Sequence, residues 1–317
     1  HHGIGRRQRQ MCIRDSPQNW TRGHLFKPAQ VMVLSAFSFS LMSLCVKQLG
    51  GRIPVAEVVF IRALISLGLS WWVIQSQGVS PWGNSRPMLV WRGVVGTLAL
   101  FCFYGAISQL PLAAATVLQY LYPTFTAALA WGALGERAGK RILLAMALGW
   151  LGVLLVAQPD WLAQLTGDSA MDPLPAIAVA IGITGALLTA LAYVTVRHLA
   201  TDEHRSVIIF YFPLMSVPMA LPFVLANPVW PNATEWAWLI GVGLFTQLGQ
   251  IFLTRGLSSM PAARATAINY VQVVFAALWG LLFLGESINE LMVMGAVLVL
   301  GATLISIRPP RKPQPLH

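Results

Sequence analysis

The chain has 317 residues, of which 56% are hydrophobic and only 10% are charged, and its mean hydropathy is +0.66. A soluble domain carries about 25% charged residues, so this chain has too few to solvate a globular surface of its size. The composition therefore excludes a soluble globular protein and predicts one with many membrane spans.

Apolar stretches of about 20 residues recur along the chain, and each is long enough to cross a hydrocarbon layer about 30 Å thick. In lipid each stretch must be a helix, because no water is present to satisfy open backbone groups. We therefore predict an all-α membrane protein with ten transmembrane helices. The predicted spans lie near residues 28–49, 54–75, 90–109, 111–134, 141–158, 175–197, 206–226, 236–254, 262–284 and 291–307.

The two ends of the chain are polar. Residues 1–27 are predicted to form a disordered tail, and they contain no apolar segment that would suit a signal peptide. The run HHGIGRRQRQMCIRDS at positions 1–16 resembles a translated sequencing-library adapter, so we expect it not to be native. Residues 309–317 are predicted to be a basic cytoplasmic tail.

The net charge of +10 suggests a nucleic-acid partner until the positions of the charges are considered. After position 16, and apart from Arg62 inside the second span, only Lys47 and Arg52 fall on one side of the ten predicted spans, and the other basic residues fall on the opposite side. This asymmetry follows the positive-inside rule, predicts cytoplasmic termini, and makes anionic lipid the expected counterion instead of nucleic acid. The cytoplasmic set includes Arg22, Arg86, Arg92, Arg137, Arg197, Arg264 and Arg308.

The cysteines predict no disulfide and no metal site. Cys12, Cys45 and Cys102 are odd in number and follow no spacing pattern, and two of them lie inside predicted spans. No GxxxxGK[ST] phosphate-binding motif is present. We expect no cofactor, and the energy for any transport must then come from a gradient or from exchange.

The chain repeats itself. Residues 104–137 align without a gap on residues 254–287, at a constant difference of 150 in residue number, which we call the repeat offset. The predicted spans divide into two halves of five, 28–158 and 175–308, and an odd number of spans forces the second half to enter the membrane the opposite way up. Many secondary transporters build one central site from inverted repeats of this kind.

Two ionisable residues lie inside the second predicted span, which is costly and therefore indicates function. Arg62 is near the middle of the span, and Glu57 is nearer its outer end. Five positions apart, they do not share a helix face. One hypothesis is that Arg62 points into a central cavity and binds an anionic group of the substrate. The alternative is that it binds carbonyls or a polar side chain of a neighbouring helix and locks the bundle.

A polar stripe occupies matching positions of the fourth and ninth spans, at i, i+3, i+4 and i+7 spacing. Such stripes either hold helices together or line a wet path, and their occurrence in both halves favours the path. Pro123 also leaves the carbonyl of Gln119 without its helical partner, free for a ligand or for a neighbouring helix. The candidates are Thr116, Gln119, Tyr120, Thr266, Asn269 and Tyr270, with Tyr122 and Gln272 a step round each helix.

Three further groups are weaker. Gln247 and Gln250 place amides in the eighth span, where hydrogen bonding between helices explains them about as well as a binding site. The seventh span is broken by prolines that suit either a gate or a static kink. The turns after the fourth and ninth spans are expected to be structural, with glycine at the left-handed helix end and glutamate at the start of the next helix. The prolines are Pro213, Pro218 and Pro222, and the turns contain Gly135, Glu136, Gly285 and Glu286.

The repeated runs LPLAAATVLQYLYPTFTAALAWGALGER and MPAARATAINYVQVVFAALWGLLFLGES, with PVAEVVFIRALI upstream, resemble the EamA family of the drug/metabolite transporter superfamily. The resemblance covers residues 28–308 and implies ten helices in a bacterial-type inner membrane. It also implies a cavity lined by spans 1–4 and 6–9, with spans 5 and 10 at the periphery and often at a homodimer contact. Family members carry amino acids, nucleotide-like metabolites, sugars, choline or drugs, so the resemblance names no substrate.

These observations favour a secondary transporter of a small polar metabolite that works by alternating access. One arginine among amides, hydroxyls and aromatic rings suits a substrate with a carboxylate, such as an amino acid or a related compound. Glu57 is the candidate for proton coupling. The alternatives are a membrane-embedded enzyme, which would need a clustered acid, base or metal at one depth, and a passive channel. All six histidines lie outside the spans or at their ends, which argues against the enzyme.

Overall fold

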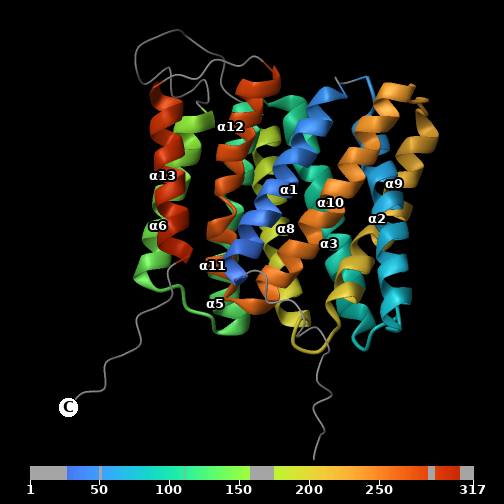
Figure 1. Ribbon diagram of the computed structural model, residues 1–317, viewed down its shortest axis with the longest axis horizontal. Coiled ribbons are helices and arrows are strands. Elements are labelled where there is room, and N and C mark those ends of the chain that lie inside the picture. Colours follow the sequence, from blue (N-terminus) through green and yellow to red (C-terminus); the bar gives the residue numbers. More distant parts are fainter. Residues whose placement is uncertain (1–26, 50–51, 111, 158–174, 285–289, 308–317) are drawn as a thin grey trace, which may run out of the picture.

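The computed structural model describes residues 27–49, 52–110, 112–157, 175–284 and 290–307, and the predicted tails and the turn at Gly285 and Glu286 lie outside these residues. The described residues form twelve helices that run roughly side by side (Figure 1). The helices are α1 Pro28–Gln48, α2 Val55–Gln77, α3 Arg86–Gln109, α4 Leu112–Gln119, α5 Tyr122–Leu134, α6 Lys140–Ala157, α8 Ala176–Leu199, α9 Arg205–Ala226, α10 Ala233–Ser259, α11 Ala262–Ile268, α12 Val271–Leu284 and α13 Glu290–Ile307.

Eight of the helical segments in the described residues are long and apolar enough to cross a membrane, with Ala262–Phe283 counted as one. The protein is therefore a multi-pass membrane protein, as its composition predicts. The other two predicted spans correspond to α6 and to the pair α4 and α5, which are not among these eight. The number ten consequently stays a prediction.

Local sequence explains several helix ends. Asn232 and Glu235 form a reciprocal capping box that begins α10. Gly78 ends α2 and Gly135 ends α5, both with a positive φ that favours glycine. Glu136 follows this turn, but α6 begins only at Lys140, so the glutamate is not at the start of the next helix as the sequence suggested.

The repeat offset extends to helix boundaries well outside the segment where the sequence repeat is visible. Helix α2 begins at residue 55 and α9 begins at residue 205, which differ by the repeat offset. Both the first and the last residues of α6 and α13 differ by the same offset. Packing contacts repeat at this offset too. A Cβ added at Gly93 would lie 2.5 Å from Met215, and one added at Gly243 would lie 2.7 Å from its equivalent contact, Ile65. The two halves therefore share one fold.

Each half packs mainly against the other half, not against itself. Helix α1 lies along α10, and its counterpart α8 lies along α3, the counterpart of α10. In the first pair, the Ser35 hydroxyl donates to the Gly249 carbonyl at 3.0 Å. In the second pair, a Cβ at Gly185 would approach the Ala99 carbonyl at 3.4 Å, which is the same contact at the repeat offset.

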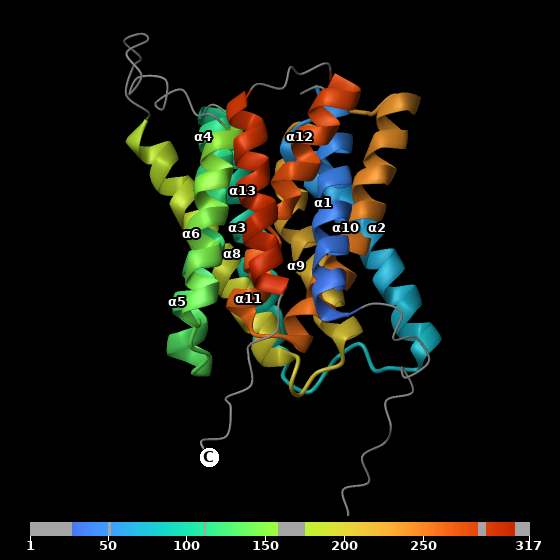
Figure 2. The same ribbon diagram turned by 60° about the vertical axis from the view of Figure 1, so that its left-hand side comes forward.

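Counterpart helices of the two halves run in opposite directions. Helix α1 rises in Figure 1, whereas α8 descends, and the N-terminal end of α1 lies on the same side of the bundle as the C-terminal end of α13 (Figures 1 and 2). The halves are thus inverted relative to each other in the structure. Helices α6 and α13 form a separate pair at one edge of the bundle.

Both halves have a helix break at the same register. Helix α4 ends at Gln119 and α5 begins at Tyr122, while α11 ends at Ile268 and α12 begins at Val271. The sequence predicted one continuous span over residues 111–134, in which Pro123 would leave the Gln119 carbonyl free, so neither break was predicted. In the structure Pro123 lies in the first turn of α5, and the second half breaks with Val273 at the equivalent position. A proline at this position is therefore not required for the break.

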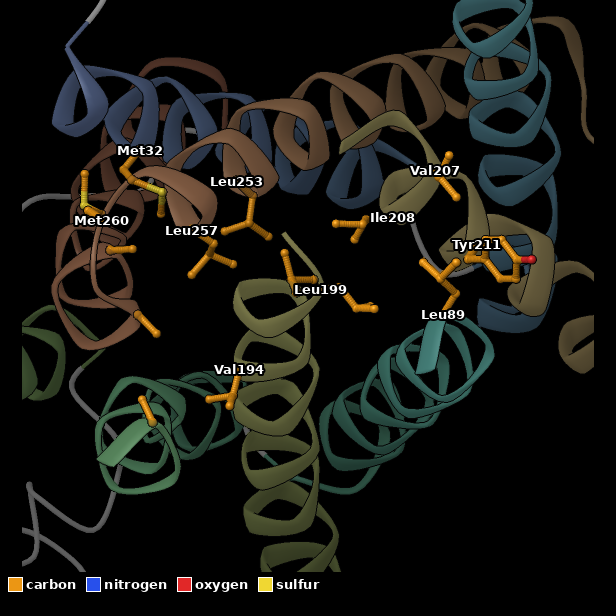
Figure 3. Packing of buried hydrophobic residues seen from close by; sticks show 14 of the residues in the cluster. Met32, Leu89, Val194, Leu199, Val207, Ile208, Tyr211, Leu253, Leu257 and Met260 are labelled. Atoms are coloured by element: carbon orange, nitrogen blue, oxygen red, sulfur yellow. The ribbon is translucent and has the colours of Figure 1, made fainter. Parts of the chain in front are cut away.

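The largest hydrophobic cluster lies toward one side of the bundle, the side of the N-terminal end of α1 and the C-terminal end of α13. It joins the C-terminal ends of α8 and α10 to the beginnings of α1, α3 and α9 (Figure 3). A smaller cluster, with Cys45, Ile61 and Leu239, packs α1, α2 and α10 toward the other side. Between the two clusters lies the polar interior described below.

The contact between α6 and α13 gives a test of the fold. A Cβ at Gly152 would lie 2.7 Å from the Gly295 carbonyl, whereas one at Gly301 would meet nothing within 4 Å. We expect Gly152→Ala to lower the free energy of unfolding by about 1–3 kcal/mol because backbone atoms must shift. The matched variant Gly301→Ala is expected to be neutral or to gain up to about 1 kcal/mol. Thermal unfolding in detergent measures both, and equal effects would contradict the packing.

Candidate functional site

A small polar pocket lies between α2, α9 and α10, and Arg62 is part of its wall. The free space inside is about enough for one water molecule, so side chains nearly fill the pocket. Arg62 is only 4% exposed, and its Nε atom has no hydrogen-bond partner among the described residues. The lining residues are Arg62, Ala63, Ser66, Ile209, Phe212, Pro213, Ser216, Thr246, Gln247 and Gln250.

A second arginine, Arg92, lies directly behind this wall. Its guanidinium carbon is 4.4 Å from the centre of the Phe212 ring, and that of Arg62 is 5.6 Å from the same centre. Arg92 donates from Nη2 to the Gln250 side-chain oxygen at 3.1 Å, while its Nε and Nη1 have no partner among the described residues. Phe212 and Gln250, which both line the pocket, therefore connect the two cations.

The sequence reasoning placed Arg92 among the cytoplasmic basic residues, and this was wrong. Helix α3 begins at Arg86, so Arg92 lies almost two turns inside the helix, and it is 2% exposed. The predicted span began near residue 90, which put Arg92 at its edge. Ser85 and Pro87 are typical residues of a helix start. Had they been used to begin this helix, Arg92 would have been predicted to lie inside the span.

The two arginines are costly where they are. Desolvation costs several kcal/mol for each buried ion, and a cation–π contact returns about 0.5–2 kcal/mol. Because both guanidinium carbons lie over one ring, they are at most about 10 Å apart, and at an effective dielectric constant of about 20 their repulsion adds at least roughly 1.7 kcal/mol. No carboxylate is among the described residues that line the pocket, so an anion from outside would relieve the imbalance.

The pocket is asymmetric although the scaffold is symmetric. The repeat offset places Arg62 opposite Phe212, so the first half supplies the cation and the second half supplies the ring. Likewise Gln250 corresponds to Leu100, and Gln247 corresponds to Thr97. The amide of Gln247 donates to the Ser70 hydroxyl at 2.9 Å. Gln247 and Gln250 thus join helices and also line the pocket.

The polar stripes form a second group, centred on Tyr120 and Tyr270. These equivalent tyrosines stack with ring centres 5.8 Å apart, and the Tyr270 hydroxyl donates to the Tyr120 carbonyl at 3.4 Å. The Gln119 amide donates to Thr189 at 3.2 Å, whereas the side-chain oxygens of Gln119 and Asn269 are buried without a partner among the described residues. The two helix breaks therefore meet at a buried polar contact between the halves.

The remaining stripe residues take different positions. Thr266 is buried and its hydroxyl donates within its own helix, so it does not face a cavity. Thr116 and Gln272 do not line the pocket at Arg62. Tyr122 packs edge-on against Tyr193 with ring centres 5.4 Å apart, so this contact joins α5 to α8.

Glu57 lies away from both groups. It is the third residue of α2, and its carboxylate accepts from the Val229 backbone N–H at 3.2 Å. Close by, Arg52 donates to Glu235, and this hydrogen bond raises the pKa of Arg52. These contacts join the start of α2 to the start of α10 at one end of the bundle, and we call the Arg52–Glu235 pair the first latch. A role of Glu57 in proton coupling stays a prediction.

The opposite end of the bundle is closed by carboxylates as well. Glu203 accepts from the backbone N–H groups of Asn84, at 2.7 Å, and Ser85, where α3 begins, and we call this contact the second latch. By the repeat offset Ser85 corresponds to Glu235, and Glu203 corresponds to Ile53, the residue after Arg52, so the second latch lies in the region equivalent to the first. Glu136 also accepts from Arg197 at 2.8 Å and from the Ala262 N–H at 2.9 Å, which ties α5, α8 and α11 together.

The prolines of α9 do not divide that helix. It runs unbroken from Arg205 to Ala226 through Pro213, Pro218 and Pro222. Pro213 is the one that also lines the pocket. Its position next to Phe212 places a missing backbone hydrogen bond beside the ring that both arginines contact.

The fold and the pocket define a multi-pass membrane protein built from two inverted halves around a buried polar centre. Residues 27–158 and residues 176–308 each match the EamA-like transporter family. The chain belongs to this family, and thus to the drug/metabolite transporter superfamily, as its sequence motifs predicted.

Named relatives agree with this class. The pseudopaline exporter CntI of Pseudomonas aeruginosa is 32% identical over 86% of this chain and 93% of its own length. Solute carrier family 35 member G1 of Mus musculus is 27% identical over 86% of this chain and 75% of its own length. A chain of known crystal structure superposes with a TM-score of 0.77 at 16% identity, over 88% of this chain and 96% of that one, which shows a shared fold.

Arg62 gives a test of whether the buried cation stabilises the protein or burdens it. We expect Arg62→Met to leave the free energy of unfolding unchanged or to raise it by about 1–4 kcal/mol, because an unpaired buried charge is removed. The comparison variant Arg197→Met breaks the ion pair with Glu136 and should be destabilising. Thermal unfolding of both purified variants measures this. A loss of stability in Arg62→Met as large as in Arg197→Met would make Arg62 a structural clamp.

Proposed function

We propose that the protein is a secondary transporter of a small polar metabolite that carries a carboxylate, such as an amino acid or a related compound. The observation that carries this proposal is Arg62, which is buried in a polar pocket between the halves with a donor that has no partner among the described residues. A guanidinium binds a carboxylate through two parallel hydrogen bonds. The hydroxyls of Ser66 and Thr246 are also buried without partners there and add hydrogen-bonding capacity to the site.

We further propose ten spans, cytoplasmic termini and an inner-membrane location. The correspondence of α6 with α13, and of the pair α4 and α5 with the pair α11 and α12, supports counting five spans in each half. Even without Arg92, the basic residues of the loops favour one side, which supports cytoplasmic termini. Helices α6 and α13 expose leucine and valine side chains that suit lipid or a homodimer contact.

The proposed mechanism is alternating access. Both latches are formed and side chains nearly fill the pocket, which supports assigning this structure to a state in which the site is not open to either side. Opening the Arg52–Glu235 latch would expose the pocket to one side of the membrane, and opening the Glu203 latch would expose it to the other. The inverted repeat supports this, because equivalent motions in the two halves open opposite faces. The exporter among the relatives supports outward transport.

The binding role of Arg62 has a direct test. We expect Arg62→Lys and Arg62→Ala to reduce transport at least about a hundredfold, because loss of a buried bidentate partner costs roughly 3 kcal/mol or more. Uptake or exchange of a panel of labelled amino acids, amines, nucleosides and sugars into proteoliposomes measures it. Arg141→Ala, which removes an exposed arginine of α6, is the control and should transport normally. Full activity of either Arg62 variant would end the proposal.

The latches give a second test. In a protein without its native cysteines, a cysteine at Ser66 reports which side reaches the pocket. Glu235→Gln weakens the Arg52 latch and should increase labelling from the non-cytoplasmic side about fivefold, which corresponds to roughly 1 kcal/mol. Glu203→Gln should increase labelling from the cytoplasmic side by a similar factor. The two variants are matched controls for each other. If both increased labelling from the same side of the membrane, the result would contradict alternating opening.

A further inference from the structure

Arg92 is the feature that the proposed function leaves unused. A transporter of a substrate with one carboxylate needs one guanidinium, yet this chain buries two against a single phenylalanine ring. Arg92 is the larger anomaly of the two, because its Nε and Nη1 both lack a partner among the described residues and its one bond goes to a neutral amide. Its cost is not explained by packing alone, since a methionine would fill a similar volume without a charge.

We propose that Arg92 forms a second anion subsite and that the substrate carries two carboxylates. This inference rests on the proposed function, in which Arg62 binds the first carboxylate. The Phe212 ring contacts both guanidinium groups, with the Arg62 carbon 5.6 Å and the Arg92 carbon 4.4 Å from its centre. A dicarboxylate whose hydrocarbon chain passes the Phe212 ring would place one carboxylate at each arginine. Gln250 lines the pocket and contacts Arg92, so it lies on the route between the subsites.

The subsite is reached when the pocket widens. In the present state Phe212 and Gln250 stand between the free space and Arg92, and Pro213 weakens the backbone next to the ring. Movement of the Phe212 ring would bring Arg92 into contact with the pocket. A positively charged pocket with two separated cations disfavours substrates with a single carboxylate, because the second arginine would stay unpaired. The second subsite therefore sets specificity as well as affinity.

The test uses thermal unfolding of the purified full-length protein with simple probes. The probes are the dicarboxylates malonate, succinate, glutarate and adipate, each paired with the monocarboxylate of the same chain length, at constant ionic strength. A ligand that binds the folded state raises the unfolding temperature by mass action. We expect at least one dicarboxylate to give the same shift as its partner at a concentration tenfold or more lower.

Variants assign the effect to residues. Arg92→Gln is expected to abolish the tenfold preference while leaving the weaker response to monocarboxylates, whereas Arg62→Gln is expected to abolish both responses. Arg141→Gln removes an exposed charge and should keep the preference. Because the wild-type comparison alone tests for the preference, a failure of Arg92→Gln to fold would still leave the proposal testable.

The outcomes separate this inference from the proposed function. Equal responses to dicarboxylates and monocarboxylates in the wild-type protein, or a preference that survives in Arg92→Gln, would overturn the second subsite and leave the proposed function standing. Stabilisation by inorganic phosphate without any by dicarboxylates would also overturn the assignment of two carboxylates. Loss of the monocarboxylate response in Arg92→Gln but not in Arg62→Gln would overturn the role given to Arg62 as well.

Discussion

Two guanidinium groups are buried with no carboxylate beside them among the described residues, and this is the constraint around which the interior is organised. Arg62 and Arg92 contact the same Phe212 ring, and three of their donor atoms have no partner among the described residues. In a low-dielectric interior such charges are costly unless polar groups of the protein or a bound ligand balance them. The amides and hydroxyls around the pocket give partial compensation. The proposed function assigns the remaining compensation to an anionic substrate.

The fold supplies that site by combining symmetry in the scaffold with asymmetry in the side chains. Contacts such as Ser35 to Gly249 recur in the other half at the repeat offset, and the tyrosine pair Tyr120 and Tyr270 stacks where the halves meet. At the pocket the equivalence stops, because Arg62 corresponds to a phenylalanine. In the proposed mechanism the scaffold uses symmetric motions, while residues that differ between the halves bind the substrate in one orientation.

Much of this could be predicted from sequence, and the exceptions have physical reasons. Composition indicated a membrane protein, the repeat indicated two related halves, and Arg62 stood out because an arginine in mid-span is costly. Arg92 was missed because the predicted span began too late, near residue 90 instead of at Arg86, which turned a buried charge into a loop charge. The break at Tyr120 was not predicted, because residues 111–134 form one apolar stretch. The break does not require a proline, since Val273 stands at the equivalent position of the second half. Tertiary packing between halves determines such features, and a single sequence does not reveal it.

The contacts of the glutamates also depended on the fold. Glu136 follows a glycine turn, and the sequence suggested that it serves the next helix. Instead it accepts from the start of α11 and from Arg197, which are distant in the chain. Which helix ends meet in the bundle decides which residue a carboxylate binds. Local sequence therefore predicts that Glu136 binds a backbone N–H at a helix start, but not which helix supplies it.

The central claim is that Arg62 binds the substrate between two inverted halves. The most direct measurement is electron cryomicroscopy of the protein in a lipid nanodisc with a transported substrate. The account predicts density for an anionic group against the Arg62 guanidinium, beside Phe212, with the equivalent helices of the two halves running in opposite directions. Density elsewhere, with Arg62 bound to backbone carbonyls or turned toward lipid, would contradict it.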